Sequence, residues 1–292
     1  MNRQHQEEQK MKTIAVSAAN GQLGRLVINQ LKARVAPDEI VALVRDPAKT
    51  QDLGVAVRKA DYTDPTGLEA ALAGVDTLLL ISGNEIGQRA VQHKNVIEAS
   101  KKVGVKRIVY TSLLKADTST LNLAPEHLET EAALKASGLS YTILRNGWYS
   151  ENYTASVAAA LANNAFYGSA GEGKISSAPR ADLAEAAAIV LTTAGHEGKT
   201  YELAGDEAYT LSELAAEISK QSAKEIPYID IPQADYANAL KQAGLPAELA
   251  EGLAAWDVSA SQGALFSNDR TLSKLLGRPT TTLAAAVKAA LA

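Results

Sequence analysis

The chain contains no cysteine among its 292 residues, which excludes disulfides, thiolate metal sites and thiol nucleophiles. It lacks any apolar run approaching the roughly 18 residues that a membrane-spanning helix requires, so we expect no membrane association. Basic residues are not in excess, since the formal net charge is −4, and this argues against a nucleic-acid partner. No carboxylate–histidine cluster has metal-ligand spacing. These absences predict a reduced, cytoplasmic setting.

We expect no signal peptide at the beginning of the given sequence. Met1–Lys10 is polar apart from its first residue and lacks the apolar centre of a signal peptide. We therefore expect residues 1–11 to be a disordered leader. The chain is 46% hydrophobic and 21% charged, an ordinary balance for a globular protein with a sizeable core.

Short apolar runs alternate with amphipathic segments over the first half of the chain. Strands are expected at 13–17, 40–44, 56–58, 77–81, 107–111 and 141–144. Helices are expected at 22–35, 66–73, 88–103 and 125–137. Continuous apolar strands separated by helices predict an α/β fold, a doubly wound parallel Rossmann sheet in the order 3-2-1-4-5-6.

The regular alternation of strands and helices ends after Arg145. Further helices are expected at 182–193, 210–222, 235–242, 246–256 and 283–291, with one strand at 201–203. We predict a Rossmann domain over 12–149 and a smaller, mostly helical substrate-binding lobe over 150–292. Some segments of the second part are expected to return to the Rossmann sheet.

A glycine turn follows the first strand and opens the first helix. Gly21 and Gly24 allow backbone N–H groups to approach a pyrophosphate at the helix N-terminus. The first glycine of the usual G-x-x-G-x-x-G pattern is replaced by Ala18, whose methyl group is tolerated where φ is negative. The turn residues expected to bind the cofactor are Ala18, Asn20, Gly21, Gln22 and Leu23.

Arg45 closes the second strand, 21 residues after Gly24, where NAD enzymes usually carry an acid. A guanidinium at this place can bind a ribose 2′-phosphate through two hydrogen bonds, and Lys49 adds a second positive charge. NADPH is therefore the expected cofactor. Asp46 leaves NADH open, because its carboxylate can accept from a free 2′-hydroxyl.

Polar residues follow the third and fourth strands. Asp61 and Tyr62 are expected beside the adenine, although a solvated loop aspartate fits equally well. The small residues after the fourth strand are expected to leave room for the middle of the cofactor and to contact it. They are Ser82, Gly83 and Asn84. Arg89 opens the next helix and faces either the diphosphate or water.

Several longer strings make the chain similar to a known family. They are Ala19–Gly24, Val44–Lys49, Tyr110–Leu114, Arg145–Tyr153, Gly195–Lys199 and Pro279–Leu283. The chain resembles the NmrA-like atypical short-chain dehydrogenases/reductases, and within them the bacterial NADPH:quinone oxidoreductase 2 group. The resemblance covers nearly everything after Met11. It implies a Rossmann fold, use of NADPH and reduction of quinones.

The catalytic pair of ordinary short-chain dehydrogenases is absent. No tyrosine is followed four residues later by lysine, and His127 and Glu131 occur where that pair would fall. Quinones explain this absence, because hydride addition yields an aromatic hydroquinone monoanion, a far weaker base than an alkoxide. Such a site needs mainly positioning and a polar contact to the carbonyl, while the cofactor supplies the hydride.

The remaining candidates lie beyond the fifth strand. Ser112 is expected to contact the nicotinamide ribose or a quinone oxygen, or simply to be a small residue at a strand end. Asn152 is expected to donate a hydrogen bond to a quinone oxygen. His127 is interpreted as a proton donor or as a helix-surface histidine, since Glu126, Glu129 and Glu131 around it look like a solvated face.

The segment after the sixth strand is expected to lie beside the nicotinamide. Its predicted cofactor contacts are Arg145, Asn146, Gly147 and Tyr149. Its predicted substrate contacts are Trp148 and Tyr153, with Phe266 as a cap from the C-terminal lobe. The alternative is that these aromatic side chains pack the joint between sheet and lobe.

Three functions remain open at this point. The first is a reductase of quinones or of another planar aromatic acceptor. The second is an NmrA-type regulator that senses NAD(P) without turnover, and the third is a reductase of triphenylmethane or azo dyes. The sequence leaves the oligomeric state open, a homo-oligomer included.

Overall fold

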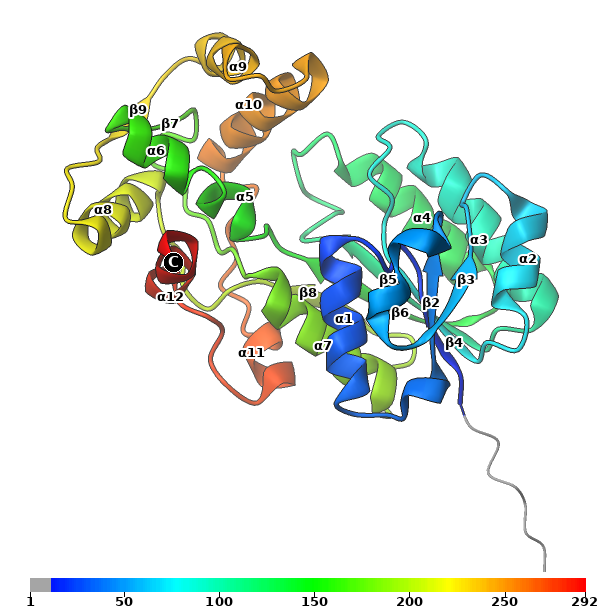
Figure 1. Ribbon diagram of the computed structural model, residues 1–292. Coiled ribbons are helices and arrows are strands. Elements are labelled where there is room, and N and C mark those ends of the chain that lie inside the picture. The colour runs from blue at the N-terminus through cyan, green and yellow to red at the C-terminus, as the bar shows by residue number, and fades with distance from the viewer. Residues whose placement is uncertain (1–11) are drawn as a thin grey trace, which may run out of the picture.

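The computed structural model describes residues 12–292, so the expected leader lies outside the described residues. A seven-stranded parallel sheet in the order β3-β2-β1-β4-β5-β6-β8 forms its centre (Figure 1). The strands of this sheet are β1 (Ile14–Val16), β2 (Ile40–Val44), β3 (Ala56–Lys59), β4 (Thr77–Leu80), β5 (Arg107–Leu113), β6 (Ser140–Asn146) and β8 (Thr200–Leu203). The predicted strand order is confirmed, and the strand expected at 201–203 extends it beyond β6.

Helices cover both faces of the sheet. The first-half helices are α1 (Gln22–Lys32), α2 (Pro65–Leu72), α3 (Arg89–Val103) and α4 (Ala124–Ala136). One apolar core lies between the sheet and α1 together with α7 (Arg180–Thr192). A second core lies under α2, α3 and α4 on the other face. Strands β1, β2 and β5 are buried along their whole length, as expected for a parallel sheet covered on both faces.

The second half of the chain forms a smaller lobe beside the sheet (Figure 1). Its elements are α5 (Glu151–Thr154), α6 (Val157–Asn163), α8 (Leu211–Ser222), α9 (Gln233–Gln242), α10 (Ala247–Ser261), α12 (Leu283–Leu291) and the two-stranded sheet of β7 (Phe166–Gly168) with β9 (Tyr228–Asp230). This lobe has its own apolar core, which includes Trp148, Tyr153 and Phe166.

Part of the second half returns to the first. Helix α7 packs along α1, and α11 (Thr271–Leu276) packs against α7, so both lie on the Rossmann side (Figure 1). Strand β8 then joins the main sheet beside β6. The second half thus contributes α7, α11 and β8 to the Rossmann side, and a boundary at 149/150 does not separate the two parts cleanly.

Several elements differ from the sequence expectation. Helix α10 continues to Ser261, beyond the predicted end at 256. The short elements α5, α6, α11, β7 and β9 were not predicted. They are three to seven residues long, and such lengths carry too few apolar positions to reveal a period.

Candidate active site

A cleft of about 530 Å³ lies at the carboxyl ends of the strands. In parallel α/β sheets, ligands bind at this edge, outside the strand ends. The lining includes 13 of the predicted cofactor residues: Ala18, Asn20, Gly21, Gln22, Leu23, Arg45, Asp61, Tyr62, Ser82, Gly83, Asn84, Arg89 and Tyr149. It also includes residues that the sequence did not single out, notably Glu85, Gln92 and Arg180.

The glycine turn packs tightly under the start of α1. A Cβ at Gly24 would lie 2.5 Å from the carbonyl oxygen of Ala18, so only glycine fits there. Gly21 is the N-cap residue, and no side chain caps the first turn of α1. The first N–H groups of this helix therefore remain available to an anion such as a pyrophosphate.

Ala18 does not keep the negative φ expected of it. Its φ is +48°, in the left-handed region that favours glycine. The expectation from the sequence is wrong here, because the tight packing of Gly24 against the Ala18 carbonyl fixes the path of the turn. The alanine therefore holds a strained conformation, which costs about 1–2 kcal/mol.

Tyr62 connects the chain segments at the base of the cleft by hydrogen bonds. Its hydroxyl donates to the carbonyl oxygen of Ile81 at 2.8 Å and lies 2.5 Å from the Ser17 hydroxyl oxygen. The Ser17 oxygen also accepts from the backbone N–H of Ile81 at 2.9 Å. Burial raises the pKa of Tyr62, so its hydroxyl stays protonated and joins the ends of β1 and β4 to the loop after β3.

The turn after β4 is fixed by His93. Its Nε2 accepts from the backbone N–H of Gly83 at 2.9 Å, and its Nδ1 pairs with the Thr130 hydroxyl at 2.9 Å. Because Nε2 accepts, the proton of the neutral ring is on Nδ1. Burial and the nearby Arg89 guanidinium lower the pKa of His93 to about 4, so the ring is neutral.

Arg89 brings a guanidinium group with one unpaired nitrogen to the middle of the cleft. Its Nε donates to the carbonyl oxygen of Gly83 at 2.5 Å. Its Nη1 is buried with no hydrogen-bond partner among the described residues. A buried guanidinium nitrogen without a partner fits an anionic group of a ligand, so Arg89 and the open N-terminus of α1 together suit a dinucleotide diphosphate.

Arg45 and Asp46 have different partners. Arg45 lines the cleft, and its Nη1 lies 3.4 Å from Glu85 Oε1. Asp46 caps the turn Pro47–Lys49 through the Ala48 N–H and lies 3.6 Å from Lys49 Nζ. Asp46 and Lys49 are not among the cleft-lining residues. The guanidinium is therefore the charged group that closes the cleft beyond β2, which favours a 2′-phosphate over a free 2′-hydroxyl.

Glu85 is paired with Arg45, so its carboxylate would compete with a 2′-phosphate for the guanidinium. We expect Glu85→Gln to tighten NADPH binding about two- to fivefold, because the exposed ion pair no longer has to be broken. NADH binding should change less than about twofold, since NADH has no 2′-phosphate for Arg45 to bind. Dissociation constants from cofactor fluorescence test this, and an equal gain for both cofactors would contradict it.

The far end of the cleft lies beyond β6. Tyr149 and Arg180 line it, with the Arg180 guanidinium carbon 4.2 Å from the Tyr149 ring centre. Asn146 Oδ1 is buried without a partner in the described part of the chain, and the Asn146 side chain interacts with Tyr149. The backbone N–H of Gly147 is already used, since it donates to the Leu203 carbonyl at 2.7 Å. The Oδ1 atom of Asn146 is thus a free acceptor near this end. The Gly147 N–H is used in the hydrogen bonding between the ends of β6 and β8.

Arg145 is buried in an ion-pair network outside the cleft lining. Its Nε and Nη2 donate to the two carboxylate oxygens of Glu131, each at 2.9 Å. Its Nη1 lies 2.9 Å from Glu202 and 3.1 Å from Asp117. Ser112 donates to the same Glu131 at 2.6 Å. Arg145 and Ser112 therefore act in joining β5, β6, β8 and α4, and the cleft does not include them.

The expected solvated face on α4 is wrong for Glu131 and His127. Their exposed fractions are 2% and 5%. His127 Nδ1 pairs with the Tyr110 hydroxyl at 2.7 Å, and burial beside Arg89 lowers the pKa of His127 to about 3. His127 is therefore neutral and inside the protein, away from the cleft lining, which does not suit the proposed proton donor.

These two histidines make stability sensitive to acid. Both are held neutral in the fold, whereas the unfolded chain binds a proton near pH 6.5. The free energy of unfolding should therefore fall by about 2 kcal/mol per histidine between pH 7 and pH 5. Urea unfolding at both values tests this, and His127→Gln should lose its share of the pH dependence. An unchanged dependence in that variant would refute the assignment.

The remaining predicted residues have mixed positions. Asn152 Oδ1 lies 3.5 Å from Arg180 Nη2, so this side chain adjoins the far end of the cleft. Trp148 is buried edge-to-face against Trp256. Tyr153 donates to buried Asp257 at 3.0 Å. Both aromatic residues belong to the lobe core, as the packing alternative predicts.

Phe266 is exposed, and its ring centre lies 5.7 Å from Lys115 Nζ, outside the cleft lining. None of the helices described over residues 12–292 is long and apolar enough to cross a membrane. Within the same residues, no group of three or more histidine or carboxylate side chains is arranged to hold a metal ion.

Comparison with known proteins agrees with this geometry. Residues 18–194 match the family model described as NAD(P)H-binding. The chain belongs to this NAD(P)H-binding family. The matched residues include the whole glycine turn, Arg45, Arg89 and Arg180, so the family region contains both ends of the cleft.

One relative and two solved structures extend the match to nearly the whole chain. Quinone oxidoreductase 2 of Escherichia coli is 60% identical over 277 residues, covering 94% of this chain and 97% of the relative. The structure of the E. coli NADPH-dependent quinone oxidoreductase QOR2 complexed with NADPH has a TM-score of 0.93 at 58% identity, covering 96% and 100% of the two chains. That of Citrobacter sp. triphenylmethane reductase complexed with NADP(H) has a TM-score of 0.92 at 39% identity, covering 95% and 100%. The resemblance drawn from the sequence is thereby confirmed.

Proposed function

We propose that this protein is an NADPH-dependent oxidoreductase that reduces quinones. The carrying observation is the cleft itself, with Arg45 at the end of β2 and the unpaired Arg89 nitrogen at its middle. This arrangement suits a phosphorylated dinucleotide, and the relative that is 60% identical is a quinone oxidoreductase. A cytoplasmic location and a homo-oligomer remain predictions.

The residues of the chain would hold the cofactor along the strand ends. Arg45 would bind the 2′-phosphate, the start of α1 and Arg89 would bind the diphosphate, and Tyr149, with the Asn146 side chain against it, would border the nicotinamide end. When bound, NADPH supplies a hydride, and the overall conversion is NADPH plus quinone plus one proton to NADP⁺ plus hydroquinone.

The chain does not need a strong acid for this conversion. His127 is buried and neutral, and Ser112 donates to Glu131, so neither is arranged to deliver a proton into the cleft. The hydroquinone monoanion is a weak base, and water at the open side of the cleft protonates it. The protein therefore contributes binding and orientation of the two reactants, together with electrostatic contacts.

A panel of acceptors tests the proposal. NADPH oxidation should accelerate with soluble 1,4-benzoquinone or 1,4-naphthoquinone well above the rate without protein. Absence of acceleration with any quinone would reject the proposal. If only triphenylmethane dyes were reduced, the similarity to the Citrobacter structure would identify the function instead. Cofactor binding without turnover on any acceptor would indicate the sensor alternative.

A further inference from the structure

The strand order separates the cleft into two ends. Arg45 follows β2, and Asp61 follows β3, at one side of the sheet. Tyr149 follows β6, on the opposite side of β1, β4 and β5. With the adenosine phosphate at Arg45, the reacting end of the dinucleotide lies toward Tyr149. Arg180 is the cationic side chain that the cleft presents there.

Arg180 lies against Tyr149, and its guanidinium N–H groups have only long contacts to neighbouring acceptors. Its guanidinium covers the Tyr149 ring at 4.2 Å, and its side chain is 17% exposed. Its Nη1 is 3.5 Å from Glu151 Oε2, and its Nη2 is 3.5 Å from Asn152 Oδ1. Both distances are long for hydrogen bonds, so the guanidinium retains capacity for a stronger acceptor.

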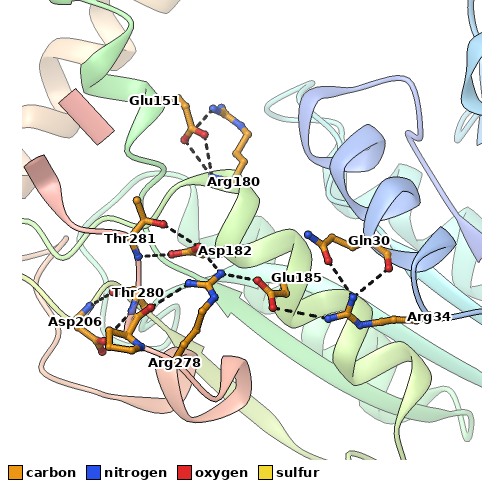
Figure 2. Close-up of polar contacts among 11 residues, drawn as sticks. Gln30, Arg34, Glu151, Arg180, Asp182, Glu185, Asp206, Arg278, Thr280 and Thr281 are labelled. Carbon is orange, nitrogen blue, oxygen red and sulfur yellow. Dashed lines mark hydrogen bonds and ion pairs between the residues drawn. The ribbon is translucent and has the colours of Figure 1, made fainter. Parts of the chain in front are cut away.

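The backbone of Arg180 is held firmly. Its N–H donates to the Glu151 carboxylate at 3.0 and 3.2 Å, which caps the start of α7 (Figure 2). Two residues later, the buried Asp182 carboxylate accepts from the Thr281 N–H at 2.7 Å and from Arg278 Nη2 at 3.0 Å. Figure 2 shows these contacts joining α7 to the segment before α12.

The contacts of Asp182 indicate a structural role for the segment Pro279–Leu283, which does not line the cofactor cleft. Pro279–Leu283 lies outside the cleft lining, yet Thr280 and Thr281 bind Asp206 and Asp182. The first turn of α7 is thereby fixed from both sides, and Arg180 projects from a rigid helix start. A pre-positioned guanidinium is suited to a charge that develops during reaction.

We propose that Arg180 is the anion-binding residue at the reacting end of the cleft, contacting the quinone oxygen that becomes negative. This rests on the proposed function. Transfer of a hydride converts the quinone to its hydroquinone monoanion and NADPH to NADP⁺, and the monoanion then takes one proton from water. Arg180 stays protonated throughout, and it stabilises the charged oxygen by a charge-assisted hydrogen bond.

Arg45 and Arg89 do not serve this purpose. Arg45 lies beyond β2, paired with Glu85, and Arg89 is tied to the Gly83 carbonyl after β4. The Arg89 charge also acts on Tyr149, but less than that of Arg180, and both Arg45 and Arg89 follow strands that precede β5 and β6 in the sheet order. An aromatic acceptor stacked at the Tyr149 end would therefore lie beside the Arg180 guanidinium, whose carbon is 4.2 Å from the Tyr149 ring centre.

The test uses 2-hydroxy-1,4-naphthoquinone, which is an anion at neutral pH, as a probe of the NADP⁺-loaded protein. Arg180→Gln should weaken binding of this probe about 10- to 100-fold and lower kcat/KM for neutral 1,4-naphthoquinone by a similar factor. Arg180→Lys should restore part of both. The matched control Arg34→Gln should leave both unchanged, because Arg34 follows the C-terminus of α1, pairs with Glu185 and lies outside the cleft lining.

The dissociation constant of NADPH separates the outcomes. It should change less than about twofold in Arg180→Gln, which also confirms that the variant folds. A parallel loss of NADPH affinity, unchanged probe binding, or no probe binding by the natural protein would each overturn the proposal. Arg180-dependent probe binding without NADPH oxidation by quinones would uphold the anion site while rejecting the proposed function.

Discussion

Arg45→Ala is expected to weaken NADPH binding about 100-fold while leaving NADH binding within about threefold. The guanidinium lines the cleft after β2, and its exposed pair with Glu85 is readily exchanged for the doubly charged 2′-phosphate. NADH lacks this phosphate and gains little from the arginine. Titration of each cofactor by calorimetry measures both effects.

Lys49→Ala provides the control for this prediction. Lys49 is also positive but lies outside the cleft lining, with its side chain 76% exposed beside Asp46. Its removal should change NADPH affinity by less than about threefold. Equal losses of NADPH and NADH in the Arg45 variant would mean that the guanidinium does not contact the 2′-phosphate.

Arg145→Met is expected to lower the free energy of unfolding by about 3–5 kcal/mol. The substitution leaves three carboxylates facing one another, and that of Glu131 is only 2% exposed. Because the arginine joins β6 to α4 and to β8, its loss affects packing across three elements.

Lys135→Met is the matched comparison for that variant. Lys135 lies 3.8 Å from the same Glu131 but is 47% exposed, so its removal should cost less than about 1 kcal/mol. Urea unfolding followed by circular dichroism compares the two. Similar stabilities for both variants would show that the buried pair does not hold the sheet edge.

The Rossmann half could be predicted because its signals are local. Apolar runs such as Leu78–Ile81 define buried strands, and the glycine turn lies next to the strand that it follows. The position of Arg45 follows from the strand end alone. Thirteen of the residues predicted to bind the cofactor line the cleft.

The residues whose positions differ from the prediction are placed by contacts between segments far apart in the sequence. Arg145 was expected at the nicotinamide, but parallel register places it between Ser112 and Glu202, where Glu131 binds it. That partner lies 14 residues earlier on a helix, and no local pattern distinguishes a buried glutamate from a solvated one. Ala18 likewise adopts a positive φ because of packing beneath it.

Arg180 could not be predicted for a different reason. It reaches the cleft because Tyr149 and Ala178 form a parallel bridge and α7 returns to pack along α1. Both contacts join segments far apart in the sequence, and the stretch before Arg180 carries no strand or helix period.

Stopped-flow oxidation of protein-bound NADPH by 1,4-naphthoquinone, in a single turnover, tests the central claim most directly. We expect the bound cofactor to be oxidised much faster than free NADPH, and more slowly when deuterium replaces the transferred hydrogen at C4. Oxidation no faster than in solution would contradict the claim that this cleft brings NADPH and a quinone together.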